Sequence, residues 1–174
     1  MFSTRPANEN DFDKIYSLYK KVATEKIGIA RSSEEITENY IHAFMKNASA
    51  SGIELVIEDP SNADRIIAEI HCYKLAPKVF SHLLSELTIV VDQDFHGKGL
   101  GKMIFKNLLD TVTETRPDIL RVELIAQESN GKAIELYKKV GFKIEGRFEK
   151  RIRTCGNNFE ADIPMAWINP NYVG

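Results

Sequence analysis

Cysteine is scarce in this sequence, which carries only Cys72 and Cys155 among its 174 residues. The pair matches no spacing of a structural metal site or a redox motif, so we expect two free thiols in a reducing compartment. The N-terminal residues lack the apolar core of a signal peptide, and no apolar run approaches the length that spans a membrane. These absences favour a cytoplasmic protein without a membrane partner.

A strong excess of charge of either sign is also absent. Lys and Arg number 23 against 25 Asp and Glu, which gives a formal net charge of -2. A protein that relies on attraction to phosphate backbones needs a basic surface, so nucleic acid is not an expected partner. With 43% hydrophobic and 28% charged residues, and without repeats, low-complexity tracts or a linker, residues 1–174 are predicted to form a single globular domain.

What is present is a succession of strand and helix patterns, in which apolar residues recur at strand or helical spacing between turn residues. The patterns predict strands at 2–5, 53–57, 66–73, 84–91, 119–127, 142–153 and 159–167, and helices at 12–22, 32–44, 101–112 and 129–140. This order predicts a mixed α/β sheet with helices on both faces.

Some residues carry more specific expectations. Ser32 and Glu35 form a candidate capping box, which places the start of the second helix at Ser32. Glu69 and His71 fall on the more polar face of their predicted strand. Pro164 has no N–H to donate, so the last strand is expected to be an edge strand or to carry a bulge.

The most informative stretch is the glycine turn from His96 to Lys102, where a predicted strand ends and a helix begins. The first turn of a helix presents unpaired N–H groups and partial positive charge that bind phosphate, and glycine lets a ligand approach the backbone closely. Gly97, Gly99 and Gly101 do not have the spacing of a dinucleotide fingerprint, and Gly101 does not fit a Walker loop. Taken alone, the turn could also be a tight connection without a ligand.

Two stretches together resemble the GNAT superfamily of acetyl-CoA-dependent N-acetyltransferases. The glycine turn is similar to its acetyl-CoA loop, (Q/R)-x-x-G-x-(G/A), with Gly99 and Gly101 as the matching glycines and His96 in place of Gln or Arg. The following helix is similar to the family's N-x-x-A-x-x-L-Y-x-x-x-G-F helix. It matches at Asn130, Ala133, Leu136, Tyr137, Gly141 and Phe142. The tail from Glu145 to Met165 also resembles the family's closing hairpin, so the resemblance covers nearly the whole chain.

The resemblance implies a GNAT-like, mostly antiparallel sheet with splayed central strands, and acetyl-CoA as cosubstrate without a metal. It implies that the strand before the loop binds the pantetheine arm through its backbone, with the Val91 N–H as an oxyanion donor. It also implies that Tyr137 protonates the leaving thiolate, although Tyr137 lies on an apolar stripe where it could simply pack. The implied cofactor-binding residues are Ile89, Val90, Val91, His96, Gly97, Lys98, Gly99, Leu100, Gly101, Lys102, Asn130 and Tyr137.

The general base is less sharply defined. Glu86 lies five residues before Val91, where some small-amine and amino-acid N-acetyltransferases of the family carry a glutamate, and it is the first candidate. The alternatives are His71, His82 and Glu123. The branch that modifies a ribosomal-protein N-terminus has an acidic residue five positions before Asn130, where this chain has Ile125.

The resulting hypothesis is an N-acetyltransferase that acts on a primary amine of a small molecule, such as an amino acid or a polyamine. The alternatives are a protein or peptide N-acetyltransferase of the ribosomal-protein type and a non-catalytic acyl-CoA-binding module. We expect the acceptor pocket between the first two helices, their connecting loop at 26–33 and the final hairpin. An edge strand near the C-terminus could also pair across a homodimer.

Overall fold

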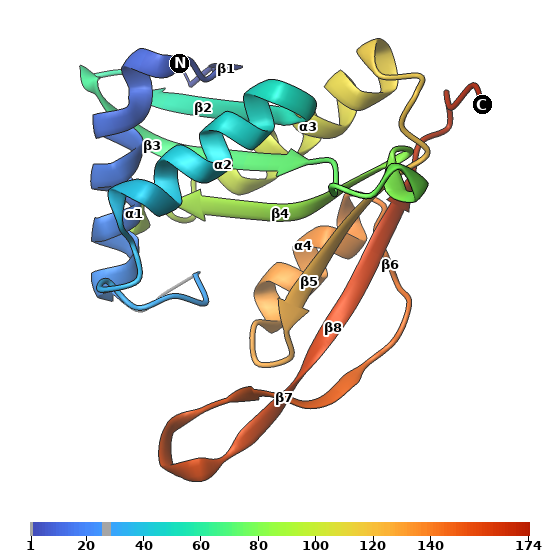
Figure 1. The fold of residues 1–174 in the computed structure, drawn as a ribbon. Helices are drawn as coiled ribbons and strands as arrows, with labels where there is room; N and C mark the ends of the chain where they lie inside the picture. The colour runs from blue at the N-terminus through green and yellow to red at the C-terminus, as the bar shows by residue number, and fades with distance from the viewer. Residues whose placement is uncertain (1, 26–28) are drawn as a thin grey trace.

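The computed structural model describes residues 2–25 and 29–174, so part of the loop expected to border the acceptor pocket lies outside the described residues. Within them, the strands form one sheet in the order β1-β2-β3-β4-β5-β8-β6, with β7 paired to β8 (Figure 1). The strands are β1 Thr4–Pro6, β2 Ile53–Asp59, β3 Asn62–Tyr73, β4 Leu83–Val91, β5 Arg121–Gln127, β6 Lys143–Ile144, β7 Phe148–Arg153 and β8 Phe159–Ile168. The pair of β4 with β5 is parallel and the other pairs are antiparallel. The expected mixed, mostly antiparallel sheet is confirmed.

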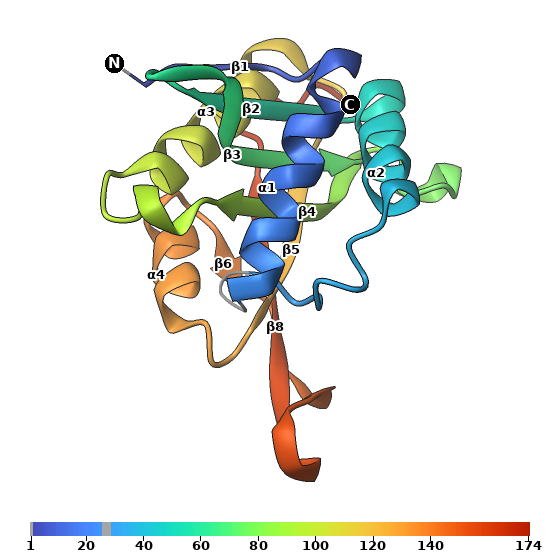
Figure 2. The same ribbon diagram turned by 90° about the vertical axis from the view of Figure 1, so that its left-hand side faces the viewer.

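The helices cover both faces of this sheet, as the sequence predicted. They are α1 Phe12–Glu25, α2 Glu38–Ser51, α3 Leu100–Thr115 and α4 Gly131–Lys139. In Figure 2, α1 and α2 lie on one side of β2, β3 and β4, and α3 lies on the other. Each face buries its own apolar cluster, one beneath α1 and α2 and a larger one beneath α3 and α4. Removing this apolar surface from water is the main driving force for the arrangement.

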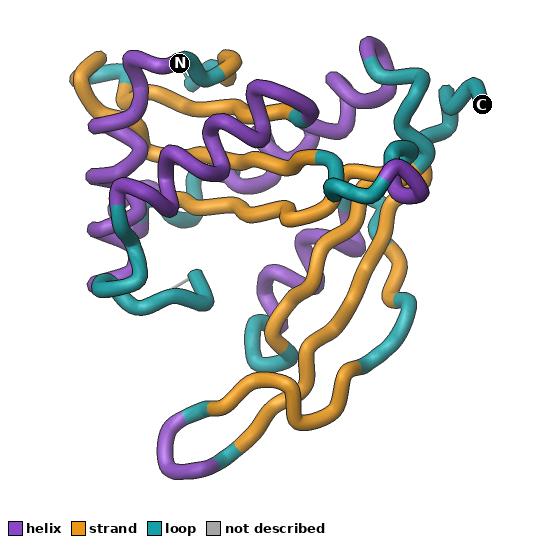
Figure 3. Tube along the Cα trace, in the orientation of Figure 1, coloured by secondary structure: helices purple, strands orange, loops and turns teal. Residues whose placement is uncertain are grey.

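The C-terminal part of the sheet extends beyond the helices. Figure 3 shows β7 and the adjoining part of β8 reaching past the end of β5 as a two-stranded arm. The register of β7 on β8 shifts between Phe148 and Ile152, and Lys150 has a φ of 54° there. Such a bulge twists an edge strand away from flat pairing with another chain.

The second helix begins later than the sequence predicted. The Ser32 N–H does donate to Glu35 Oε2 at 2.7 Å, but this interaction closes a turn before the helix. The helix begins at Glu38, where the Thr37 hydroxyl oxygen accepts a hydrogen bond from the Tyr40 N–H at 3.2 Å. Thr37 is therefore the N-cap, because its side chain satisfies an amide that has no partner inside the helix.

The last strand is not at the edge, because β8 lies between β5 on one side and β6 and β7 on the other. Pro164 is tolerated because β6 ends at Ile144 and β7 begins at Phe148, so the missing N–H faces the break between them. The Pro164 carbonyl still accepts a hydrogen bond across this break, from the Glu145 N–H at 3.0 Å. The expectation of an edge strand was wrong, and the bulge in this hairpin lies in β7 rather than in β8.

Candidate functional site

The site is organised by the divergence of β4 and β5. These strands are paired at Leu83 with Arg121 and at Leu84 with Val122, and then they separate (Figure 1). In the described part of the chain, three cavities open along the separation, and Tyr137 lines two of them. We call the first the glycine-turn cleft, which has a volume of about 870 Å³ and lies between β4, the glycine turn and α4. We call the second the inner cavity, which has a volume of about 460 Å³ and lies between β4, β5 and α2.

Alternation along β4 determines which backbone groups face the separation. The Asp92 N–H donates to the Ile67 carbonyl of β3 at 2.9 Å, so Val90, two residues earlier, also turns its backbone toward β3. The N–H groups of Ile89 and Val91 consequently point the other way, into the separation. Both residues line the glycine-turn cleft.

Val90 differs from Ile89 and Val91, because its backbone faces β3 and not the separation. It pairs with Glu69 on β3, and its side chain is buried in the cluster beneath α1 and α2. Of the three residues expected at the site, Ile89 and Val91 therefore turn their backbone toward the cleft and Val90 turns away from it, because neighbouring residues of a strand face opposite ways.

The glycine turn leads directly into α3. Gly97 and Gly99 have φ angles of 75° and 79°, which L side chains rarely adopt, whereas Gly101 lies within the first turn of the helix. The first N–H bonded within the helix is that of Met103, which donates to the Gly99 carbonyl at 3.0 Å. The amides before it are the ones that a helix start presents to an anion. They open onto the glycine-turn cleft.

A buried carboxylate fixes the base of the turn. Asp92 is 1% exposed and accepts hydrogen bonds from Lys21 of α1 at 2.7 Å and from Arg65 of β3. Burial opposes ionisation of Asp92, but these two cations still hold its pKa below the usual value. Its Oδ1 also accepts from the Asp94 N–H at 3.1 Å, which ties the strand end to the turn.

Positive side chains lie on both sides of the cleft. Lys102 on α3 lines it, and so does Lys132 on α4, which the sequence analysis missed although it stands inside the quoted helix motif. Lys98 lies instead over the Phe95 ring, with Nζ 4.4 Å from the ring centroid. The structure therefore brings Lys102 and Lys132 together at the cleft and turns Lys98 aside.

His96 and Asn130 border the cleft and also hold local structure. The His96 side chain is exposed, and its Nε2 lies 3.1 Å from the Val91 carbonyl. Asn130 caps α4, since its Oδ1 accepts from the Ala133 N–H at 3.3 Å. Asn130 lines both cavities, so the capping role and a binding role remain compatible.

Tyr137 lies on α4 where the two cavities meet, and it lines both of them. Its ring contacts Phe105 and Phe142, with centroids 5.3 and 6.3 Å away. Burial raises the pKa of Tyr137 to about 12, so the phenol carries its proton throughout the neutral range. Tyr137 is thus both a core residue and a hydroxyl donor at the junction of the cavities.

Glu86 stands at an irregularity of β4. Between the pairs His71–Thr88 and Tyr73–Ser85, β4 spans one residue more than β3 does, which is a bulge. Glu86 has a φ of 55° there, a conformation that costs a residue with a side chain roughly 1–2 kcal/mol. Glu86 is exposed and lines the inner cavity. Strained backbone of this kind is concentrated at functional sites.

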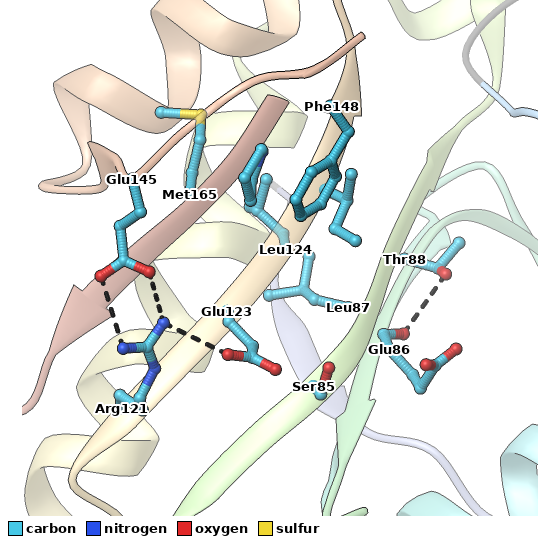
Figure 4. Close-up of a pocket in the computed structure, with 12 residues that line it drawn as sticks. Ser85, Glu86, Leu87, Thr88, Arg121, Glu123, Leu124, Glu145, Phe148 and Met165 are labelled. Carbon is cyan, nitrogen blue, oxygen red and sulfur yellow. Dashed lines mark hydrogen bonds and ion pairs between the residues drawn. The ribbon is translucent and has the colours of Figure 1, made fainter. Parts of the chain in front are cut away.

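Two of the alternative bases lie elsewhere. Glu123 lies 3.2 Å from Arg121, which also binds Glu145 at 2.6 Å. Figure 4 shows this ion-paired group gathered at one end of an outer pocket, apart from Glu86. His82 lies just before β4, where its carbonyl accepts from the Leu120 N–H at 2.7 Å. Neither Glu123 nor His82 is among the residues that line the inner cavity.

The face of β3 that looked more polar is buried, because α1 and α2 cover it. Glu69 is 0% exposed and His71 is 2% exposed. The Tyr19 hydroxyl donates to Glu69 Oε2 at 2.6 Å, and Glu69 Oε1 lies 3.0 Å from His71 Nδ1. His71 also lines the inner cavity, so a buried polar row leads from α1 to its wall.

Glu54 on β2 pairs with His71 across the strands and adds another acid to this face. Burial, followed by the charge of Glu69, raises the pKa of Glu54 from 4.5 to about 8. Its Oε1 is buried without a hydrogen-bond partner among the described residues. Glu54 is consequently protonated at neutral pH.

Glu54→Gln is expected to stabilise the fold at pH 8 and to change little at pH 4. Below 4.5 the carboxyl is protonated in both folded and unfolded chains, whereas between about 4.5 and 8 only the folded chain keeps the proton, so stability falls as pH rises. The gain at pH 8 should be on the order of 4 kcal/mol in the free energy of unfolding. Urea unfolding of both proteins across this range measures it, and an equal difference at both ends would contradict the assignment.

Other site types find no support in the described residues. No group of three or more His, Cys, Asp or Glu side chains in residues 2–25 and 29–174 could hold a metal ion. The helices in the same residues are too short or too polar to cross a membrane. Burial raises the pKa of the free thiol of Cys72 to about 12, so it is a poor nucleophile.

Comparison with known proteins gives three kinds of similarity. A family model described as an acetyltransferase (GNAT) domain matches residues 3–143. Spermidine N(1)-acetyltransferase of Escherichia coli is 34% identical over 65 residues, which are 37% of this chain and 34% of that protein. Ribosomal protein bS18-alanine N-acetyltransferase of Salmonella typhimurium is 43% identical over 78 residues, which are 45% of this chain and 51% of that protein. The matches thus span between about a third and a half of these relatives.

A solved structure extends the likeness over the whole fold. It is the crystal structure of a GNAT superfamily phosphinothricin acetyltransferase from Sinorhizobium meliloti in complex with AcCoA. It superposes with a TM-score of 0.78 at 15% identity, covering 99% of this chain and 90% of that chain.

Proposed function

The chain belongs to the GNAT family of acetyltransferases, and on that premise we propose that it is a single acetyl-CoA-dependent N-acetyltransferase domain acting in the cytoplasm. The proposed acceptor is a primary amine of a small molecule, such as an amino acid or a polyamine. The observation that carries the proposal is the position of Tyr137, which lines both the glycine-turn cleft and the inner cavity. Acetyl-CoA in the glycine-turn cleft and an amine in the inner cavity would meet at the Tyr137 hydroxyl.

The residues of the glycine-turn cleft fit acetyl-CoA. The first amides of α3 and the cations Lys102 and Lys132 suit its phosphates, and the outward-facing amides of Ile89 and Val91 suit its amide-rich arm. The relative from Sinorhizobium meliloti was solved with AcCoA, which supports the same assignment here. The cosubstrate supplies an acetyl group activated as a thioester.

At the junction, three groups of this chain have distinct tasks. The Val91 N–H points into the separation, where it can donate to the oxygen that becomes negative as the amine attacks. Glu86 helps to remove the amine proton, directly or through a water molecule. Tyr137 donates a hydrogen bond to the departing sulfur. The pKa of Tyr137, about 12, exceeds the value near 8.5 of an ordinary thiol, so proton transfer to the sulfur alone is uphill. The step balances when the positively charged nitrogen of the adduct gives its proton to the Tyr137 oxygen as the hydroxyl proton passes to the sulfur.

A thiol-release assay with acetyl-CoA tests the proposal directly. The acceptor panel contains amino acids, polyamines, aminoglycosides and peptides. We expect turnover with at least one free small amine and weaker turnover with peptides. Absence of turnover across the panel, with acetyl-CoA bound, would favour the non-catalytic acyl-CoA-binding alternative.

The protein or peptide N-acetyltransferase remains the second candidate, because the relative from Salmonella typhimurium modifies a ribosomal protein. The position that is acidic in that branch is Ile125, which is 48% exposed and lines the inner cavity. An apolar side chain there cannot take up a proton, so this candidate needs a base elsewhere. Faster acetylation of peptide N-termini than of every free amine would establish it.

Glu86→Gln is expected to lower turnover at least about tenfold at pH 7, since a positioned base contributes roughly 10²–10⁴-fold. The loss should be largest at low pH and should shrink as the free amine becomes abundant. The pH–rate profiles of parent and variant measure this, with Glu114→Gln, which removes an exposed carboxylate near the far end of α3, as the control. Profiles that overlay would exclude Glu86 from proton transfer.

A further inference from the structure

The buried row of Tyr19, Glu69 and His71 ends at the wall of the inner cavity. A hydrophobic core does not need buried ionisable side chains for its packing. We propose that His71 is the catalytic group that finally receives the amine proton, with Glu69 and Tyr19 as the residues that position it. The inference rests on the proposed function, because it assigns a proton route to the same reaction. His71 lies on β3 and is buried, whereas Glu86 lies on β4 and is exposed.

Hydrogen bonding along the row fixes the ring of His71. Burial raises the pKa of Tyr19 well above 10, so its hydroxyl stays protonated and donates to Glu69 Oε2 at 2.6 Å. An ionised Glu69 can only accept, so we assign a hydrogen to His71 Nδ1, which lies 3.0 Å from Glu69 Oε1. Nε2 then carries the lone pair, and it is the nitrogen left for the cavity that His71 lines.

Aromatic contacts hold the ring in this orientation. Phe44 of α2 stacks on His71 with centroids 4.0 Å apart and the planes inclined by 10°. The Tyr73 ring is nearly parallel to it at 6.1 Å. A ring that is stacked and hydrogen-bonded at Nδ1 presents Nε2 in one direction, which is what a general base needs.

The chemistry favours an imidazole as the final acceptor over a carboxylate alone. An ordinary imidazole has a reference pKa about two units closer to that of an alkylammonium than a glutamate has, so it takes up the proton with less opposition. Glu86 is exposed on β4, where it can attract the ammonium and pass its proton inward. The nitrogen–hydrogen bond of the ammonium breaks and an Nε2–H bond forms. The free amine then attacks, while Glu69 neutralises the imidazolium.

Other ionisable groups surround His71 on each element that packs against it, and their charges enter any pH dependence. They are Tyr19 on α1, Tyr40 on α2, Glu54 on β2, Glu69 and Tyr73 on β3, Glu86 on β4, Tyr137 on α4, and Arg31 before α2. Because the raised pKa of Glu54 keeps it neutral near pH 7, Glu69 is the carboxylate that balances a charged His71.

The test begins with the parent enzyme on an amine that it acetylates, which separates failure of this inference from failure of the proposed function. His71→Gln should lower kcat/KM by about 10²-fold at pH 7. The loss should shrink as the pH rises toward the pKa of the acceptor amine, because more of the amine is then already deprotonated. Acetyl-CoA affinity, measured by calorimetry, should stay within a few-fold. His42→Gln is the matched control, because His42 is also stacked on an aromatic ring but lies on the exposed face of α2.

Glu69→Gln gives the readout that a purely structural role would not move. The ascending limb of its kcat/KM profile should shift to lower pH, because an imidazolium without its carboxylate partner gives up its proton more readily. Parental profiles in folded His71→Gln and Glu69→Gln variants would overturn the proposal. If either variant fails to fold, long-range ¹H–¹⁵N spectra of the parent protein decide instead. A His71 ring protonated at Nε2 rather than Nδ1 excludes it as the base.

Discussion

Turnover should fall by roughly 10²-fold or more when Tyr137 is replaced by phenylalanine, since positioned proton donors contribute about that much in the transition state alone. The change removes one oxygen and keeps the ring between Phe105 and Phe142, so the free energy of unfolding should change little. Acetyl-CoA affinity should change by less than about tenfold. Steady-state kinetics, calorimetry and urea unfolding of the same preparations measure the three quantities.

An acyl donor with a more acidic thiol provides the control for Tyr137→Phe. Such a sulfur leaves without help, so the difference between parent and variant should shrink with this donor. The role of Tyr137 as a proton donor is refuted if the Phe variant turns over acetyl-CoA at the parental rate while chemistry limits the rate. It would then be a packing residue only.

Acetyl-CoA should bind well over tenfold more weakly to Gly101→Glu than to the parent. The variant places a carboxylate in the first turn of α3, where the amides and Lys102 favour an anionic ligand, and negative charge there repels phosphate. The matched change is Gly101→Ala. Its Cβ would lie 3.7 Å from Leu136 and 3.9 Å from Val91, which are ordinary contacts, and the φ of Gly101 is not positive.

Calorimetry on the two variants separates charge from shape. We expect Gly101→Ala to keep the parental affinity within a few-fold, and we expect folding of both variants to be retained. Equal affinity in a folded Gly101→Glu variant would remove the cosubstrate from this cleft. Gly99→Ala is less informative, because the φ of 79° strains any side chain there whether or not a ligand binds.

The elements and the glycine-turn cleft could be predicted from sequence because their signals are local. The glycines of the turn and the helix motif from Asn130 to Phe142 each involve only a few neighbouring residues. The start of α2 was misplaced because Ser32 and Glu35 do form the expected hydrogen bond, but a turn satisfies it as well as a helix does. The local sequence pattern therefore identified the hydrogen-bond partners, Ser32 and Glu35, but not the secondary structure that they form.

The remaining features of the site depend on tertiary neighbours. Glu69 and His71 were expected on the more polar face of their strand, and the sequence does not show that α1 and α2 cover and bury that face. The bulge that turns Glu86 arises from pairing between β3 and β4, which no local pattern records. Lys132 could have been found from sequence, because it lies in the first turn of a predicted helix. In the structure it lines the glycine-turn cleft, where the phosphates are proposed to bind.

The parting of β4 and β5 after Leu84 also shapes the exchange of amide hydrogens with solvent. In a central strand, amides normally exchange only when the sheet opens. Here Val90 and Asp92 turn to β3 and should be protected, whereas Ile89 and Val91 face the separation and should exchange far faster in the free protein. A ligand that bonds to these two amides completes the sheet as a surrogate strand. Its arrival would appear as slowed exchange at every second residue of β4.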